Sequence, residues 1–152
     1  MNTIFICTGN TCRSPLAEVI ARDLWLDSRE ELKFSSAGIG AVAGLAAAEN
    51  SRIVAGEHDL DLEEFSSRSF TREEAEKADL LLCMTSNHKY IIGSKYPELK
   101  KKIFTLKEFC GKEGDISDPF GGDLQEYRNC FREIRECLVN IKEKELFSLF
   151  KN

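Results

Sequence analysis

The start of the chain constrains the fold most, because an apolar run leads through a short polar loop into a helix signal. Residues 3–7 are apolar and rich in β-formers, which fits a buried parallel strand. A loop at 8–13 follows, and Ser14-Pro15 then opens a helix, since Ser is a preferred N-cap and Pro suits the first helical turn. A strand that passes through a tight loop into a helix begins a βαβ unit.

The rest of the chain alternates strand and helix signals, without an internal repeat or a linker. We predict further strands at residues 32–36, 79–84 and 103–106. One helix is expected within 45–55, stopped by Gly56, a second begins at a capping box at Thr71, and a third runs from after Met84 to near Gly93. The last helix is expected along the apolar stripe of Leu124, Tyr127, Phe131, Ile134, Leu138 and Ile141. This pattern predicts an α/β fold: a single three-layer domain over residues 1–152, with a central four-stranded parallel sheet flanked by helices. Ligands of such sheets bind at the carboxyl ends of the strands, where the first loop lies.

Composition and charge exclude several classes of protein. The chain has 152 residues, a formal net charge of −5 and no long basic block, so we expect no nucleic-acid partner. The N-terminal apolar run is too short for a signal peptide, and no stretch approaches the roughly 18 apolar residues of a membrane span. We therefore expect a cytoplasmic monomer that does not contact membranes, with reduced cysteines. His58 and His88 lie far apart and no zinc-like spacing occurs, so we expect no metal and no other cofactor.

The loop after the first strand places Cys7 six residues before Arg13. Free N–H groups and the helix dipole favour an anion at such a junction, and Gly9 permits the backbone angles of a loop that wraps around it. Arg13 presents a planar fork that matches two phosphoryl oxygens, and the same positive field favours Cys7 as thiolate. Ser14 is close enough in sequence to donate to that sulfur. Dinucleotide and Walker motifs are absent, so the loop predicts a phosphatase with a cysteine nucleophile.

A thiolate that attacks phosphorus also needs a general acid to protonate the leaving group. The long loop at residues 110–123, between the fourth strand and the last helix, is the candidate segment. Asp118 stands out there because Pro119 restricts its backbone. The residues alone do not exclude Asp115 or Asp123.

The loop and the Asp118-Pro119 pair resemble two motifs of a known family, the low-molecular-weight phosphotyrosine phosphatases. The phosphate loop of that family is similar to Cys7-Thr8-Gly9-Asn10-Thr11-Cys12-Arg13-Ser14-Pro15, and its general-acid motif is similar to Asp118-Pro119. Segments at 36–38, 67–68 and 79–85 also resemble the family, so the similarity covers nearly the whole chain.

The resemblance implies a two-step mechanism without a metal. Cys7 attacks phosphorus while Arg13 and the loop amides hold the oxygens, and Asp118 protonates the leaving group and later activates water. Asn10 would keep the shape of the loop and Ser14 would stabilise the thiolate. The resemblance implies that Thr8, Gly9, Asn10, Thr11, Cys12, Ser14 and Phe120 bind the substrate.

Two departures from the tyrosine-specific members predict a different substrate. Thr11 stands where those members usually carry isoleucine or another bulky apolar residue, and Phe120 is followed by Gly121-Gly122 instead of a second aromatic residue. Both features, and residues 103–109, resemble the bacterial protein arginine phosphatases. Thr11 would leave room for a branched guanidinium. We predict phosphoarginine in proteins as the substrate, with phosphotyrosine as the alternative.

Two other functions are disfavoured. Arsenate reductases of this fold need two cysteines seven residues apart near the third strand, but Cys83 is followed at that spacing by Tyr90. A module that only binds phosphorylated residues would not need a nucleophile and an acid.

The remaining cysteines divide into one candidate for redox chemistry and several packing residues. Cys12 lies five residues from Cys7, so oxidation could join the two sulfurs reversibly, while the alternative is that Cys12 only fills a tight loop. Cys130 and Cys137 are expected to pack on the last helix, and Cys83 inside a strand.

Overall fold

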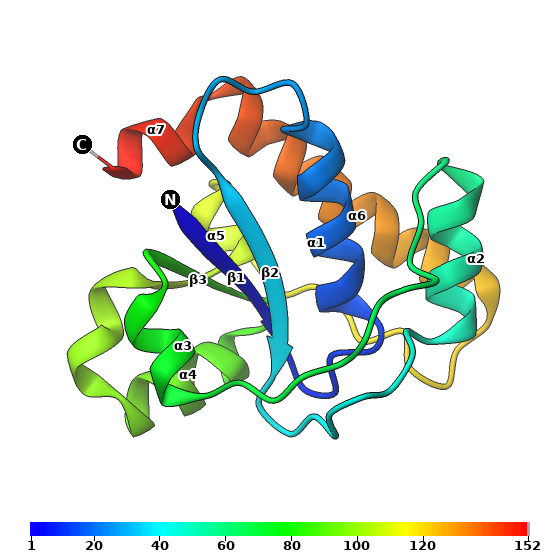
Figure 1. Cartoon of the computed structure of the whole chain (residues 1–152), viewed down its shortest axis with the longest axis horizontal. Helices are drawn as coiled ribbons and strands as arrows, with labels where there is room; N and C mark the ends of the chain where they lie inside the picture. Colours follow the sequence, from blue (N-terminus) through cyan, green and yellow to red (C-terminus); the bar gives the residue numbers. More distant parts are fainter. Residues whose placement is uncertain (152) are drawn as a thin grey trace.

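The computed structural model describes residues 1–151, and its centre is a four-stranded sheet in the order β2-β1-β3-β4. The strands are β1 (Asn2–Cys7), β2 (Lys33–Gly38), β3 (Leu80–Cys83) and β4 (Ile103–Thr105). All neighbouring strands are parallel, which confirms the predicted sheet. β1 lies in the interior of the sheet, so the loop that follows Cys7 leaves from the middle of the carboxyl edge (Figure 1).

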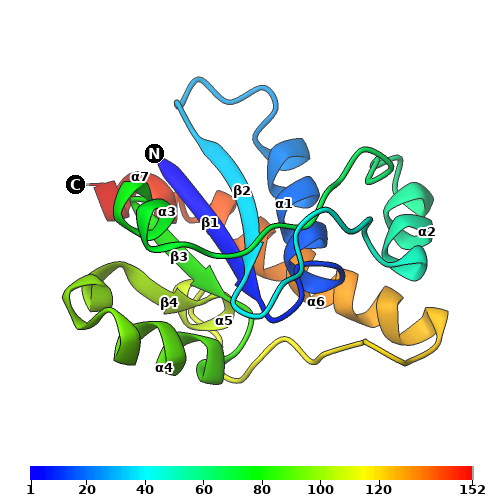
Figure 2. The same cartoon turned by 60° about the horizontal axis from the view of Figure 1, so that its bottom comes forward.

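Helices cover both faces of this sheet (Figures 1 and 2). They are α1 (Arg13–Leu24), α2 (Glu49–Glu57), α3 (Arg72–Lys77), α4 (Ser86–Lys95), α5 (Leu106–Phe109), α6 (Leu124–Glu143) and α7 (Leu146–Lys151), with a 3₁₀ helix η1 (Pro97–Lys102) before β4. Phe5 and Leu82 belong to the apolar cluster that includes α1 and α6, whereas Ile6 and Leu81 belong to the cluster under α3 and α4. The alternation of side chains along each strand therefore builds a three-layer fold, as predicted.

Several predicted boundaries were wrong by a few residues. Gly56 lies inside α2, which ends at Glu57, and α4 extends to Lys95. The fourth strand ends at Thr105 because its hydroxyl and the side chain of Glu108 form a capping box that starts α5. The predicted capping box at Thr71 is confirmed.

The long apolar stripe predicted for the last helix lies on α6 and is confirmed as a core-facing surface, but the unpredicted α7 follows α6. Ile134, Leu138 and Ile141 of α6 are fully buried, and Cys130 and Cys137 are also buried, as predicted. Cys83 is buried within β3. Within residues 1–151 no helix is long and apolar enough to span a bilayer.

Candidate active site

The loop of residues 8–12 connects β1 to α1 and is packed against the end of β2. Gly38, the last residue of β2, makes this approach possible: a Cβ there would lie 2.4 Å from the Thr8 carbonyl oxygen and 3.0 Å from the Asn10 nitrogen. Any larger residue would push the loop away from the sheet. The backbone of residue 38 thus determines how close the loop lies to the carboxyl edge.

Cys7 is buried at the start of this loop, with two polar groups at its sulfur. The Ser14 hydroxyl lies 2.8 Å from Sγ, and the Asn10 backbone N–H donates to Sγ over 3.3 Å. Ser14 Oγ accepts a hydrogen bond from Asn10 Nδ2 at 2.8 Å, so its own proton is available to the sulfur. The prediction that Ser14 is the N-cap was wrong, because α1 already begins at Arg13 and has no side-chain cap. The Cys7 sulfur thus lies beside two groups that can donate hydrogen bonds to it.

Asn10 holds the loop in a backbone conformation that few residues adopt. Its φ is +54°, in the left-handed region, whereas Gly9 has no positive φ, so the prediction that Gly9 supplies this freedom was wrong. The fully buried side chain of Asn10 donates to Ser14 and, over 3.0 Å, to Ser36 Oγ, and its Oδ1 accepts from the Arg68 backbone N–H at 2.9 Å. Three hydrogen bonds in a buried setting offset the cost of this conformation.

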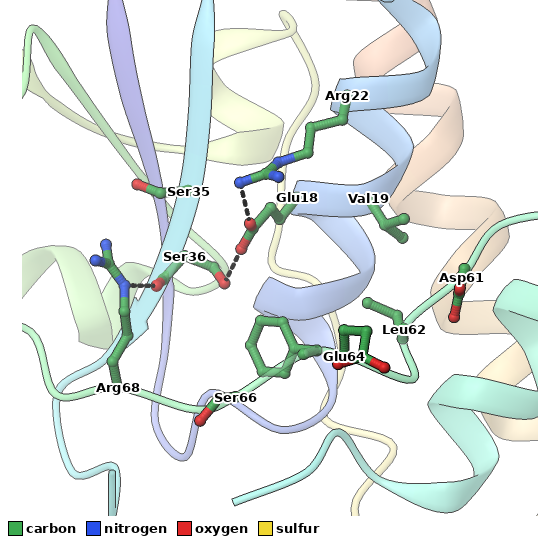
Figure 3. Close-up of a pocket in the computed structure, with 11 residues that line it drawn as sticks. Glu18, Val19, Arg22, Ser35, Ser36, Asp61, Leu62, Glu64, Ser66 and Arg68 are labelled. Atoms are coloured by element: carbon green, nitrogen blue, oxygen red, sulfur yellow. Dashed lines mark hydrogen bonds and ion pairs between the residues drawn. The ribbon is translucent and has the colours of Figure 1, made fainter. Parts of the chain in front are cut away.

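A hollow of about 420 Å³ lies behind this support, between α1, β2 and the segment of residues 61–68 (Figure 3). Ser36 donates to Glu18 Oε2 at 2.5 Å, Glu18 pairs with Arg22 at 2.7 Å, and Arg68 Nε donates to the Ser36 carbonyl at 2.8 Å. These side chains point toward one another around Ser36 (Figure 3). The hollow therefore adjoins the groups that hold Asn10.

Arg13 lies buried beside the loop and pairs with Asp118. Its Nη1 donates to the Ile116 carbonyl at 3.0 Å, and its Nη2 lies 3.4 Å from Asp118 Oδ2. The Asp118 side chain is 53% exposed, so it can meet both the arginine and a ligand from solvent. The structure thus brings together the two charged residues that the sequence placed 105 positions apart.

The other two aspartates of the loop have structural partners. Asp115 accepts from the Ser86 backbone N–H at 2.8 Å and from its hydroxyl at 3.3 Å. Asp123 is the N-cap of α6 and accepts from the Glu126 N–H at 2.9 Å. Only Asp118 among the three pairs with Arg13. It therefore stays the predicted general acid.

The remaining predicted site residues lie at different depths. Thr11 is half-buried, and Phe120 is 79% exposed. Cys12 is buried, with its sulfur 3.4 Å from the Tyr127 hydroxyl, and burial raises the pKa of the Cys12 thiol. Its thiol therefore stays protonated near neutral pH, and a disulfide between Cys7 and Cys12 stays a prediction.

His88 also contacts the loop, a contact that was not predicted because Thr8 and His88 lie 80 residues apart in the sequence. The imidazole Nε2 lies 2.9 Å from Thr8 Oγ1 and Nδ1 lies 3.0 Å from Thr85 Oγ1. Burial, and secondarily the charge of Arg13, lowers the pKa of His88 to about 4. Its position in the first turn after Thr85, a residue type that caps helices, was the available signal.

The parallel sheet, the loop around the Cys7 sulfur and the paired Arg13 define a cysteine-dependent phosphatase. The family model described as "Low molecular weight phosphotyrosine protein phosphatase" matches residues 2–147. The chain belongs to this family, which confirms the predicted resemblance.

The similar proteins are named either as arginine phosphatases or as tyrosine phosphatases. A "Protein-arginine-phosphatase" of Bacillus subtilis is 40% identical over 95% of this chain and 96% of its own length. A "Low molecular weight protein-tyrosine-phosphatase PtpB" of Staphylococcus haemolyticus is 38% identical over 88% of this chain and 92% of its own length. Among solved structures, "YwlE arginine phosphatase", a mutant with a phosphorylated active-site serine, superposes with a TM-score of 0.90 at 36% identity, covering 95% of each chain.

Proposed function

We propose that this chain hydrolyses phosphoarginine in proteins through a phosphocysteine intermediate. The observation that carries the mechanism is the pairing of exposed Asp118 with buried Arg13 at 3.4 Å, beside a cysteine whose sulfur has two hydrogen-bonding neighbours. One loop binds the phosphoryl group and attacks it, and a second loop supplies the acid.

In the first step the Cys7 thiolate attacks phosphorus in line with the leaving nitrogen. The S–P bond forms and the P–N bond to the guanidinium breaks, while Asp118 gives its proton to the departing nitrogen. Arg13 and the loop amides hold the three equatorial oxygens, whose charge they stabilise in the transition state. The products of this step are free arginine side chain and phosphocysteine.

In the second step water replaces the sulfur on phosphorus. Asp118, now a carboxylate, takes a proton from the attacking water, and the S–P bond breaks to release inorganic phosphate. Ser14 then stabilises the restored Cys7 thiolate through the contact of 2.8 Å. We assign no metal and no cofactor to either step.

The substrate preference rests on the residues that face the leaving group. Thr11 is smaller and more polar than isoleucine, which favours a guanidinium over a phenyl ring. Gly121 has φ of +78°, a conformation that disfavours a second aromatic side chain after Phe120. Thr8, Gly9, Asn10, Thr11, Cys12 and Ser14 would line the phosphoryl site, with Phe120 at its rim. The similarity to proteins named arginine phosphatases supports the same substrate.

The test compares kcat/KM on a phosphoarginine peptide and on a phosphotyrosine peptide of the same sequence. Cys7→Ser serves as the inactive blank, and Thr11→Ile is measured alongside. We expect the parent to prefer phosphoarginine and Thr11→Ile to lose or reverse that preference. A parent that prefers phosphotyrosine would keep the mechanism but overturn the substrate, and would favour the alternative suggested by the relatives named tyrosine phosphatases.

We also propose that the chain folds as a single domain over residues 1–152 and acts as a cytoplasmic monomer. One sheet with an apolar layer on each face supports the single domain. The net charge of −5 and the lack of a basic block support proteins, not nucleic acids or membranes, as partners.

A further inference from the structure

His88 touches the phosphate loop from inside the protein. Its side chain is 3% exposed, yet both ring nitrogens have hydroxyl neighbours: Thr8 at 2.9 Å and Thr85 at 3.0 Å. Thr8 directly follows the nucleophile in the chain. Because the imidazole lies beneath the loop, it does not reach a bound substrate, and the steps above assign it no role.

The turn that carries His88 is tied to both functional loops. Thr85 caps α4 by accepting the His88 backbone N–H at 3.2 Å. Ser86 binds Asp115 of the acid loop, and the Met84 carbonyl accepts from Ile116 N–H at 2.9 Å. The start of α4 is thus a fixed point from which His88 extends toward Thr8.

The hydrogen-bonding groups around the ring define one consistent proton arrangement. Thr85 Oγ1 already accepts from the backbone, so its hydroxyl proton can be donated to Nδ1. The proton of the neutral ring then lies on Nε2 and is donated to Thr8 Oγ1. The charge of Arg13 disfavours a positive charge on the ring. The carboxylates of Asp118 and Asp115 favour it, each with a weaker effect.

We propose that His88 is a positioning residue that holds Thr8, and with it the phosphate loop, in the conformation that binds the phosphoryl group. This proposal rests on the proposed function, because it assumes that the loop binds phosphate. His88 acts through Thr8 and touches no reacting atom. Gly38 and Asn10 hold the loop from the β2 side, whereas His88 holds it from the α4 side.

The test uses two amide variants that each keep one of the two hydrogen-bonding positions. The amide nitrogen of Gln can take the place of Nε2, so His88→Gln keeps the contact with Thr8. The shorter Asn reaches only the place of Nδ1, so His88→Asn keeps Thr85 and loses Thr8. For both variants we would measure the inhibition constant of inorganic phosphate and the kinetic constants of hydrolysis. Each variant is measured well below its own melting temperature.

We expect His88→Asn to weaken phosphate inhibition about tenfold, the usual effect of one lost hydrogen bond, and His88→Gln to stay within about threefold of the parent. In a Thr8→Val background the effect of His88→Asn should fall below about twofold, because the partner hydroxyl is gone. Equal phosphate constants for the two amides, or full additivity with Thr8→Val, would overturn the proposal. A parent that phosphate does not inhibit would overturn the proposed function as well.

Discussion

Asn10 illustrates how single residues determine this site. A left-handed backbone at a non-glycine residue persists because both ends of the buried amide are bonded to the protein. The sequence predicted a loop between Cys7 and Arg13 because these residues are close together in the chain, and β1 and α1 do flank such a loop. It could not predict that Asn10, and not Gly9, adopts the unusual angle, since Ser36 and Arg68 lie far away in sequence.

At this scale we predict that Asn10→Ala destabilises the protein by roughly 2–4 kcal/mol, because it removes three buried hydrogen bonds and retains a strained φ. Asn10→Gly should cost roughly 1 kcal/mol less, since glycine adopts that φ freely. Urea unfolding followed by circular dichroism measures both values. Identical stabilities of the Ala and Gly variants would show that the backbone of residue 10 is not strained.

Among the elements, the loop of residues 110–123 shows what periodicity cannot reveal. The stripe of α6 was predictable because it repeats over many turns, whereas η1, α5 and α7 are too short to produce a pattern. In sequence, only the neighbouring Pro119 distinguishes Asp118 from Asp115 and Asp123. Their contacts with Arg13, Ser86 and the start of α6 separate the three clearly. The role of each carboxylate thus depends on which part of the protein lies next to it along the loop.

We expect Asp118→Asn to lower kcat/KM roughly a hundredfold or more, because the amide cannot protonate the leaving nitrogen. Asp115→Asn and Asp123→Asn are matched controls, since asparagine still accepts hydrogen bonds at a helix start, and they should remain within about fivefold of the parent. Steady-state kinetics on a phosphoarginine peptide measures all three. A larger loss in Asp115→Asn or Asp123→Asn than in Asp118→Asn would reassign the acid.

For the whole molecule, the burial of His88 beside the phosphate loop connects the site to the free energy of unfolding. The three layers were predictable from the alternation of strands and helices, and the parallel sheet with an apolar cluster on each face confirms them. For His88 the helix-start signal at Thr85 was available in the sequence. The burial of its ring was not, because it arises only when α4 packs beside the loop. A neutral histidine in that interior makes the free energy of unfolding depend on pH.

The pKa of His88 falls from 6.5 to about 4 on folding, so the unfolded chain binds the proton more tightly between these values. This contribution to stability is complete above pH 6.5 and is lost as the pH falls toward 4, by roughly 3 kcal/mol in total. We predict that His88→Asn flattens this part of the stability curve. Parallel curves for parent and variant in urea titrations from pH 7 to 4 would contradict the assignment.

The support of Asn10 by protein groups has a consequence for how turnover responds to inorganic phosphate, the product. Since Ser14, Ser36 and Arg68 hold the loop, its shape does not depend on the organic group that the phosphate carries. We expect a loop of this preformed shape to bind inorganic phosphate as well as the phosphoryl group of a substrate. Accumulated phosphate should then compete with the substrate and slow dephosphorylation, which product-inhibition kinetics would measure.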